Sequence, residues 1–427
     1  MDTPTPPVLY DGATRNRCRG FLLVLFLGLV PGMLMILVVS MGLAVCSKIS
    51  FLGIAAPQMN SRAVPNVVRE PSGNQARTSF DGRAFSDQRG SPRKDANVRS
   101  TKMLAFHVNW DKNSLVSLKA NIGSIDVLVP EWLHLSSGGS VSVDDPERMD
   151  STLALIRSEK PDLSIMPLIN NFNNETQSWD RNLLSQAIGT ESSRRKLIRN
   201  LIDFNRKHGF SGISIDFEAV PKKEQANLSL FMAELYAEFH KAGLQVSQNI
   251  PLDDDAFDAK ELGKSVDFLI LMAYDEHSTY STSAGPVASQ GWFARALDRR
   301  FKELPAEKYA VSIGGYGYDW VGNSQSGKNV TFDGAMRVAQ DSKATVAVDA
   351  SSLNTTYSYR DVNNVLHHVW LLDAVSAFNQ MKATRALGSP YGYVLWRLGS
   401  EDPDIWNIIP KKDAPDDFND NEYRYSP

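Results

Sequence analysis

Two acidic residues stand one residue apart in the middle of the chain, in the stretch SGISIDFEAV, and their spacing suits acid catalysis. Alternate residues of a β-strand face the same way, so Ser214, Asp216 and Glu218 share one face of this run. Carboxyl groups about 7 Å apart along a strand repel when both are charged, which raises the pKa of one of them. A general acid needs such a raised pKa at neutral pH. An ion pair or a helix cap is the alternative that this pair alone leaves open.

Two other apolar runs end in residues that could hold a sugar ring. LMAYDEH places Met272 and Tyr274 on one face and Asp275 at its edge, and GYVLWRLG carries Trp396. A sugar needs an aromatic plate for its apolar face and hydroxyl or carboxyl groups for its polar edges. Each aromatic residue taken alone is also typical of a core, so the three runs have to be read together.

Further candidates lie close to predicted strand ends. Tyr316 and Trp320, just after YAVSIGGYG, are expected to line a groove. The aspartates 253–255 follow another strand and could touch substrate, although a helix cap is the favoured interpretation. Adjacent His367 and His368 would face opposite ways on a strand, so we predict no metal site there.

Short β-rich runs alternate with helical patterns between residues 101 and 410, and this alternation predicts the elements that position these residues. Residues 194–209 and 225–243 have apolar residues at helical spacing and end in glycine. Eight strand–helix units predict an α/β fold, the (β/α)8 TIM barrel, with its site at the carboxyl ends of the strands. A doubly wound open sheet is the alternative. The eight predicted strands are MLAFHVNW, SIDVLVPEWLHL, LSIMPLIN, GISIDFE, LQVSQNI, DFLILMAYD, YAVSIGGYG and GYVLWRL.

The segments outside the barrel predict export and tethering. Residues 20–46 are long and apolar enough to form one transmembrane helix that crosses a bilayer core of about 30 Å, with a cleaved signal peptide as the alternative. The arginines before this run keep residues 1–19 in the cytoplasm, so the barrel lies on the periplasmic or extracellular side of the cytoplasmic membrane, single-pass. Residues 47–100 read as a disordered, flexible linker, and residues 411–427 as an acidic tail.

Composition narrows the classes of function. The formal charge of −4, from 45 basic and 49 acidic residues, gives no strong field for nucleic acid. The two cysteines, Cys18 and Cys46, both lie near the amino end, so the barrel has neither disulfides nor thiolate metal ligands, and its stability must come from a core.

At these residues the sequence resembles glycoside hydrolase family 18, the chitinase-like barrels. The family signature DGxDxDxE stands here as Ser211, Gly212, Ser214, Asp216 and Glu218. MAYDEH matches the family's MxYD, and VLWRLG carries its tryptophan. The chain is also similar to the spore-germination and cell-wall branch through SIDFE and YGYDW. VNWDKNSLVSLKANI and LVPEWLHL resemble the amino-terminal barrel module of polysaccharide deacetylase/glycosyltransferase fusion proteins.

The resemblance implies substrate-assisted hydrolysis at an N-acetylhexosamine. Glu218 would protonate the glycosidic oxygen, Asp216 would orient the acetamido group that attacks the anomeric carbon, and Tyr274 would hydrogen-bond the acetamido carbonyl. Asp275 would help to hold the ring, and Trp396 would lie beneath it. The resemblance implies no cofactor and no metal.

The chain departs from the family at two signature positions. Ser211 and Ser214 stand where the family has aspartates, and a serine can donate a hydrogen bond but cannot take up charge. We therefore expect slow hydrolysis or an altered pH range. Met272, Tyr316 and Ser214 complete the predicted substrate-binding residues.

The resulting hypothesis is a membrane-anchored glycosidase that hydrolyses a β-linked polysaccharide containing N-acetylglucosamine, which could be chitin-like, peptidoglycan or an exopolysaccharide. The alternative is a non-hydrolytic glycan-binding or assembly subunit of an exopolysaccharide system. The two serines favour the alternative, whereas Asp216, Glu218 and Tyr274 favour the enzyme. A separate polysaccharide synthase or deacetylase is a possible partner in either case.

Overall fold

The computed structural model describes residues 101–254, 256–279, 281–322 and 327–409. The predicted cytoplasmic segment, anchor and linker (residues 1–100) and the predicted tail (residues 411–427) lie outside the described residues. Within the described ranges, no helix is both long enough and apolar enough to cross a membrane.

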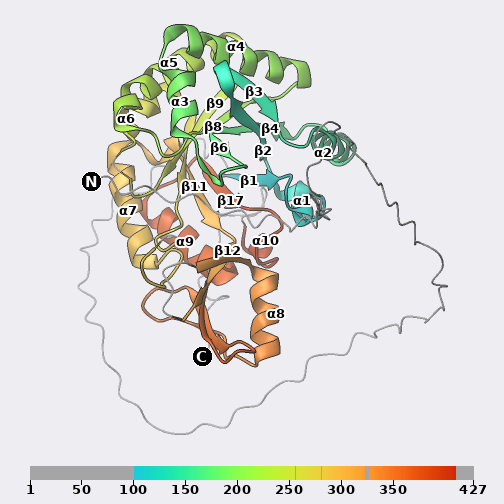
Figure 1. Ribbon diagram of the computed structural model, residues 1–427, viewed down its shortest axis with the longest axis vertical. Helices are drawn as coiled ribbons and strands as arrows, with labels where there is room; N and C mark the ends of the chain where they lie inside the picture. The colour runs from blue at the N-terminus through green and yellow to red at the C-terminus, as the bar shows by residue number, and fades with distance from the viewer. Residues whose placement is uncertain (1–100, 255, 280, 323–326, 410–427) are drawn as a thin grey trace, which may run out of the picture. The chain divides into compact units, whose positions relative to one another are not determined.

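Eight parallel strands form a closed barrel (Figure 1). Strand β1 pairs in parallel with both β17 and β2, which joins the first strand to the last and closes the ring. The closed ring confirms the predicted TIM barrel and excludes the open doubly wound sheet. In chain order the strands are β1 (Lys102–Val108), β2 (Val127–Ser136), β5 (Leu168–Asn170), β8 (Gly212–Asp216), β9 (Gln245–Pro251), β10 (Phe268–Met272), β11 (Tyr309–Gly314) and β17 (Gly392–Trp396).

The third predicted strand is divided in two. The run LSIMPLIN forms β4 (Ser164–Ile165) and β5, with Pro167 between them, and both pieces pair with β2. Proline has no N–H to give to the sheet, which explains the interruption. The antiparallel strand β3 (Ser140–Val143) extends β2 outward.

Helices surround the barrel, and the two predicted most clearly are confirmed. Helix α4 (Glu191–His208) begins at a Thr190 capping box and ends at Gly209, whose φ of 72° suits glycine. Helix α5 (Gln225–Lys241) ends just before Gly243, also at φ 72°. The other helices are α1 (Lys112–Asn121), α2 (Pro146–Glu159), α3 (Arg181–Ile188), α6 (Ala259–Leu262), α7 (Gln290–Glu303), α9 (Ala374–Leu387) and α10 (Ile405–Ile408). Shorter elements are β6 (Phe172–Asn173), β7 (Ser178–Trp179), and the 3-10 turns η1 (Ile122–Ser124), η2 (Ser137–Gly139), η3 (Lys222–Glu224), η4 (Gly263–Ser265) and η5 (Ala306–Lys308).

An insertion between β11 and α9 was not predicted from the sequence. It forms an antiparallel sheet in the order β13-β12-β16-β15-β14, with one helix, and it extends from the barrel in the orange and red part of Figure 1. Its elements are β12 (Tyr316–Val321), β13 (Gly327–Thr331), α8 (Phe332–Ser342), β14 (Ala347–Val348), β15 (Thr355–Arg360) and β16 (Leu366–Leu371). Trp320 on β12 is fully buried, with its ring 6.2 Å from that of Tyr318, so the prediction that Trp320 lines a groove is wrong.

Two apolar layers follow from the strand alternation. On β1, Leu104 and Phe106 point into the barrel, whereas Met103 and Ala105 pack outward against the helices. Each large side chain buried in this way contributes about 1.5–3 kcal/mol to folding.

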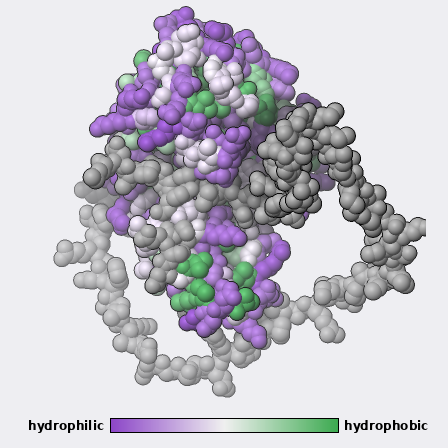
Figure 2. Space-filling view, viewed as in Figure 1, coloured by the Kyte–Doolittle hydropathy of each residue, from purple (hydrophilic) through white to green (hydrophobic). Residues whose placement is uncertain are grey.

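The insertion carries part of the exposed apolar surface. Figure 2 shows green hydrophobic patches among hydrophilic residues, both over the helices at the top of the view and over the insertion at the bottom. Four exposed valines belong to the insertion: Val321, Val346, Val362 and Val365.

Candidate active site

Strand β8 delivers the paired carboxyl groups to the mouth of the barrel. Asp216 is its last residue and Glu218 follows two residues later, and their exposed fractions are only 6% and 8%. Asn171, which comes directly after β5, accepts a hydrogen bond from the Glu218 N–H at 2.9 Å and donates one to the Glu218 carbonyl at 3.1 Å. The glutamate is thus held in place just beyond the end of its strand.

Burial and neighbouring charge keep both carboxyl groups partly or wholly protonated. Burial raises the pKa of Asp216 to about 7, the charge of Glu131 adds to the rise, and a hydrogen bond with Asn249 opposes it. Burial also raises the pKa of Glu218 well above its ordinary value, and Asp216, Asp275 and Asp254 raise it further. Burial and these charges therefore favour the protonated form of Glu218, which is the form that can donate a proton.

The end of β10 supplies a tyrosine and a third buried carboxyl group. Asp275 accepts hydrogen bonds from the hydroxyls of Tyr316 and Tyr318, the latter at 2.7 Å. Burial raises the pKa of Asp275 to about 6, and these two bonds limit the rise. Tyr274 is 7% exposed, and burial followed by the charge of Asp275 raises its pKa well above the ordinary value, so it is a hydrogen-bond donor at neutral pH.

Aromatic rings cover one side of this cluster. Trp396, at the end of β17, lies with its ring 6.5 Å from that of Tyr274 at an interplanar angle of 30°, and it meets Phe106 edge-on at 5.0 Å. Tyr316 is 2% exposed and meets Tyr274 edge-on at 5.8 Å, so it supports Asp275 and Tyr274 from within the protein. The barrel therefore brings Tyr274, Asp275, Tyr316 and Trp396 together, and Met272, partly buried at the end of β10, packs against the same aromatic cluster.

The two serines of the signature differ in position: Ser214 is in the middle of β8, whereas Ser211 lies just before it. Ser214 is fully buried inside the barrel and donates to Asn249 Oδ1 at 3.1 Å. Ser211 precedes the strand, where its hydroxyl donates to the Ile165 carbonyl at 2.8 Å and meets the Ser164 hydroxyl at 2.7 Å. Only Ser214 is close enough to affect the carboxyl groups at the barrel mouth.

Several polar residues of the site were missed from the sequence: Glu131, Asn170, Asn171, Asn249 and Tyr318. Glu131 had a usable signal, because it has the same strand parity as Val127 and Val129 and is the one acid in an otherwise apolar run. The asparagines had none, since a single amide at a strand end is common in any protein.

The favoured cap interpretation of the aspartates after β9 is wrong for the two that the structure describes. Asp258 caps α6, whereas Asp253 accepts from Trp292 at 3.0 Å and from Arg299 at 2.7 Å. Asp254 acts instead on the pKa of Glu218. Asp255 lies outside the described residues.

The histidine pair lies in the insertion, away from the barrel mouth. His367 Nδ1 is 2.8 Å from Asp319 and His368 Nδ1 is 2.8 Å from Ser358. Among the described residues, no group of three or more His, Cys, Asp or Glu side chains could hold a metal ion.

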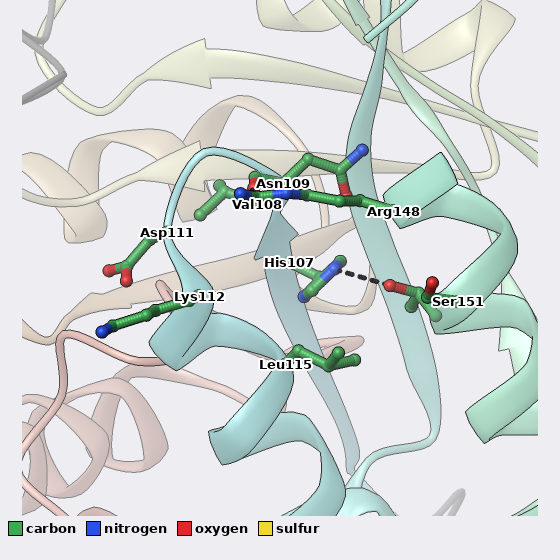
Figure 3. Close-up of a pocket in the computed structure, with 9 residues that line it drawn as sticks. His107, Val108, Asn109, Asp111, Lys112, Leu115, Arg148 and Ser151 are labelled. Carbon is green, nitrogen blue, oxygen red and sulfur yellow. Dashed lines mark hydrogen bonds between the residues drawn. The ribbon is translucent and has the colours of Figure 1, made fainter. Parts of the chain in front are cut away.

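A cavity of about 170 Å³ lies outside the barrel, between β1, α1 and α2. Figure 3 shows His107 pointing from β1 toward α2, with Lys112 and Leu115 on α1 and Arg148 on α2 around it. His107 is bonded to Ser114 and Thr152, and burial lowers its pKa to about 4. None of the predicted site residues lines this cavity, so the chemistry belongs to the barrel mouth.

A closed parallel barrel with buried acids at its carboxyl rim is the architecture of a TIM-barrel enzyme that uses acid catalysis. The sequence model of glycosyl hydrolases family 18 matches residues 102–401, and the chain belongs to this family of glycoside hydrolases. The recognition made from the sequence motifs is thereby confirmed.

Individual relatives are identical to the chain at about a quarter of the aligned positions. The uncharacterized glycosylase YvbX of Bacillus subtilis is 25% identical over 327 residues, which cover 74% of this chain and 92% of that protein. The cortical fragment-lytic enzyme of Bacillus subtilis is 27% identical over 271 residues, which cover 59% of this chain and 61% of that enzyme. The crystal structure of a chitinase from Chromobacterium violaceum matches with a TM-score of 0.67 at 24% identity, over 73% of this chain and 98% of that one, a likeness of fold.

Proposed function

We propose that this chain hydrolyses β-linked polysaccharides containing N-acetylglucosamine by a substrate-assisted, retaining mechanism. The observation that carries the proposal is the buried carboxyl group of Glu218, whose pKa is raised by burial and which Asn171 holds at the barrel mouth beside Asp216. A group of this kind serves as a general acid, and a protein that only binds glycans has no need of one.

The proposed reaction has two steps. Glu218 gives its proton to the glycosidic oxygen while the bond between that oxygen and the anomeric carbon breaks, and the acetamido oxygen of the same sugar forms a bond to the anomeric carbon. Water then attacks the anomeric carbon, the bond to the acetamido oxygen breaks, and the proton of the water goes to Glu218. Two inversions give a product with the original anomeric configuration.

The other predicted residues have supporting roles in this proposal. Asp216 orients the acetamido group, and Tyr274 donates its hydroxyl hydrogen to the acetamido oxygen. Asp275 holds the ring, and Trp396 provides the apolar plate beneath it. Tyr316 fixes Asp275 through its hydrogen bond.

Peptidoglycan and chitin-like polymers are the substrates we propose first. One relative is a cortical fragment-lytic enzyme, and one protein of similar fold is a chitinase. Both kinds of polymer contain the acetamido group that the proposed mechanism requires, and an exopolysaccharide of N-acetylglucosamine would serve equally well.

The test is incubation of the full-length protein with N-acetylated chitooligosaccharides, with fully de-N-acetylated chitosan and with peptidoglycan. We expect cleavage of the acetylated substrates with the β-anomer formed first, as followed by proton NMR, and no cleavage of the de-N-acetylated polymer. Binding of the oligosaccharides without cleavage of any substrate would favour the non-hydrolytic assembly subunit instead.

We also propose that residues 20–46 anchor the protein in the cytoplasmic membrane with the barrel outside. The apolar run and the arginines before it support this placement. Membrane fractionation together with protease digestion of intact spheroplasts tests it. Recovery of the full-length chain in the soluble cytoplasmic fraction would contradict the anchor.

A further inference from the structure

A fourth buried carboxyl group, that of Glu131, lies inside the barrel, and the proposed mechanism gives it no role. Glu131 is on β2, on the same inward face as Val127 and Val129, and it is 3% exposed. A buried carboxylate is costly unless it is hydrogen-bonded or neutralised. Its presence inside the barrel therefore needs an explanation.

Two donors hold the Glu131 carboxyl group in the form of an anion. Asn170 Nδ2 donates to its Oε1 at 3.0 Å, and Trp110 Nε1 approaches its Oε2 at 3.4 Å. An amide N–H and an indole N–H can only donate, so both contacts favour the ionised form of the acid. Asn170 Oδ1 is in turn 2.7 Å from His134 Nδ1, which fixes the orientation of the amide.

The sheet register places Glu131 and Asp216 on either side of Asn170. Asn170 on β5 is the Cα partner of Asp216 on β8, and Glu131 on β2 is bonded to the Asn170 side chain. Asp216 Oδ1 is buried and has no hydrogen-bond partner among the described residues. Asn170 thus lies on the strand between those of the two acids, and its side chain donates to Glu131.

Electrostatics support a pairing of these two acids. Glu131 is the charge that acts most strongly on the pKa of Asp216, and no cation is among the groups that shift it. Two negative charges in one dry pocket with no cation do not ionise together near neutral pH. The other titratable groups around the pair are Glu218 on the same strand end as Asp216, Asp254 after β9, Tyr274 and Asp275 after β10, and His134 on β2.

We propose that Glu131 is a positioning residue that shares one proton with Asp216, with Glu131 as the ionised member and Asp216 as the protonated member of the resting enzyme. Ser214, two residues before Asp216 on β8, cannot take up charge, so the acid paired with Asp216 comes from β2 instead of β8. Glu131 acts through Asp216 and does not touch the substrate.

The inference rests on the proposed function for its catalytic consequence. When Glu218 gives up its proton, its new negative charge has a neutral Asp216 beside it in place of an anion. Without Glu131, burial would still raise the pKa of Asp216, but by less in total, so more of Asp216 would be ionised at neutral pH and would oppose the loss of the proton from Glu218. Glu131 therefore sets the pH range of the enzyme.

The test is the titration of Asp216 in the full-length protein, followed by carbon-13 NMR of labelled aspartate carboxyl groups. The signal of Asp216 is identified as the one that is missing from the spectrum of the Asp216→Asn variant. In the parent protein we expect a midpoint near neutral pH, and in Glu131→Gln a midpoint lower by about one unit or more. Equal midpoints in the two proteins would overturn the proposal.

Two further variants separate charge pairing from a merely structural role. Adding Ser214→Asp to Glu131→Gln restores a carboxylate beside Asp216, and we expect the higher midpoint to return.

Trp110→Phe removes one hydrogen-bond donor from Glu131 and leaves the carboxyl group of Glu131 in place. The proton therefore moves toward Glu131, and the midpoint of Asp216 falls by less than in Glu131→Gln. This variant tests the pairing even where Glu131→Gln does not fold, and an unchanged midpoint in it would count against the pairing.

The rate profile gives the second readout. We expect the limb of the kcat/KM profile that titrates with Asp216 to shift to lower pH in Glu131→Gln. The NMR titration needs no substrate. A parent protein that cleaves nothing, yet shows the shift in Asp216, would refute the proposed function and leave the carboxyl pair standing.

Discussion

Asn171 contacts the backbone of Glu218 from both sides: its Oδ1 accepts from the glutamate N–H at 2.9 Å, and its Nδ2 donates to the glutamate carbonyl at 3.1 Å. Both residues are buried, and they follow adjacent strands of the barrel. One amide therefore fixes where the proposed general acid sits after its own strand has ended.

Asn171→Ala should lower kcat more than it changes KM. Without the amide, Glu218 is free to shift, and displacement of a catalytic group by about 1 Å costs up to about 100-fold in rate. Two buried backbone groups also lose their partners, which costs about 1–3 kcal/mol each. Steady-state kinetics and urea unfolding measure the two effects. Asn173→Ala, at the partly exposed end of β6 two residues on, is the matched control, and an equal loss of kcat there would refute the specific role of Asn171.

Asp216→Asn should stabilise the protein at alkaline pH and not at acid pH. The pKa of Asp216 is raised to about 7 in the folded protein, whereas it is near 4 in the unfolded chain. Binding of this proton therefore contributes to the free energy of unfolding in full below pH 4, and the contribution is lost as the pH rises through 7. Asparagine stays neutral throughout. The difference in free energy of unfolding should grow between pH 5 and pH 9, with an upper bound on the order of 4 kcal/mol.

Urea unfolding of both proteins at pH 5, 7 and 9 measures that difference. Asp150→Asn changes an exposed aspartate on α2 and should show no such growth. A stability difference between Asp216→Asn and the parent that stays constant across this range is the result that contradicts the raised pKa of Asp216.

Tyr318→Phe should raise the pKa of Asp275 above its value of about 6. The tyrosine hydroxyl donates to the Asp275 carboxylate at 2.7 Å, and a bond to the ionised form lowers the pKa of an acid. The acid limb of the kcat/KM profile should move up by about half a unit to one unit, with little change at pH 8. Tyr357→Phe removes a buried hydroxyl that donates to the Ala335 carbonyl in the insertion, and it should leave the profile unmoved.

The strand β8 shows what could be predicted from sequence. Its strict alternation of apolar and polar residues fixes which side chains point into the barrel, and the structure places Ser214 and Asp216 there. Helix α4 was predicted from its apolar stripe and final glycine, which place its end correctly, whereas the helix begins three residues before the predicted start, after the cap at Thr190. Local pattern and tertiary environment coincide in these elements.

The insertion shows what could not be predicted. The run from Tyr316 to Trp320 alternates as a barrel strand does, and it follows β11 after a single residue, so the sequence gives no sign that the chain leaves the barrel. Trp320 is buried because it packs with Tyr316 and Tyr318 against the apolar cluster inside the barrel, while β12 itself pairs with a strand about 50 residues further along. Pairing at that range is invisible to local periodicity.

The two serines of the signature do not have equal consequences for the site. Ser211 and Ser214 are both departures from the family, but a strand rises about 3.3 Å per residue, so the first of them lies at the opposite end of the barrel from Glu218. Glu131 was passed over although it is the one acid in an apolar run, because its role depends on the strands β5 and β8, which the sequence alone does not place beside it.

The most direct measurement of the central claim is the cleavage rate of Glu218→Gln on N-acetylated chitooligosaccharides and peptidoglycan. Glutamine keeps the size of the side chain and has no acidic proton, so the rate should fall by about 100- to 10,000-fold while oligosaccharide binding and the melting temperature are retained. A cleavage rate in Glu218→Gln equal to that of the parent protein would contradict the account.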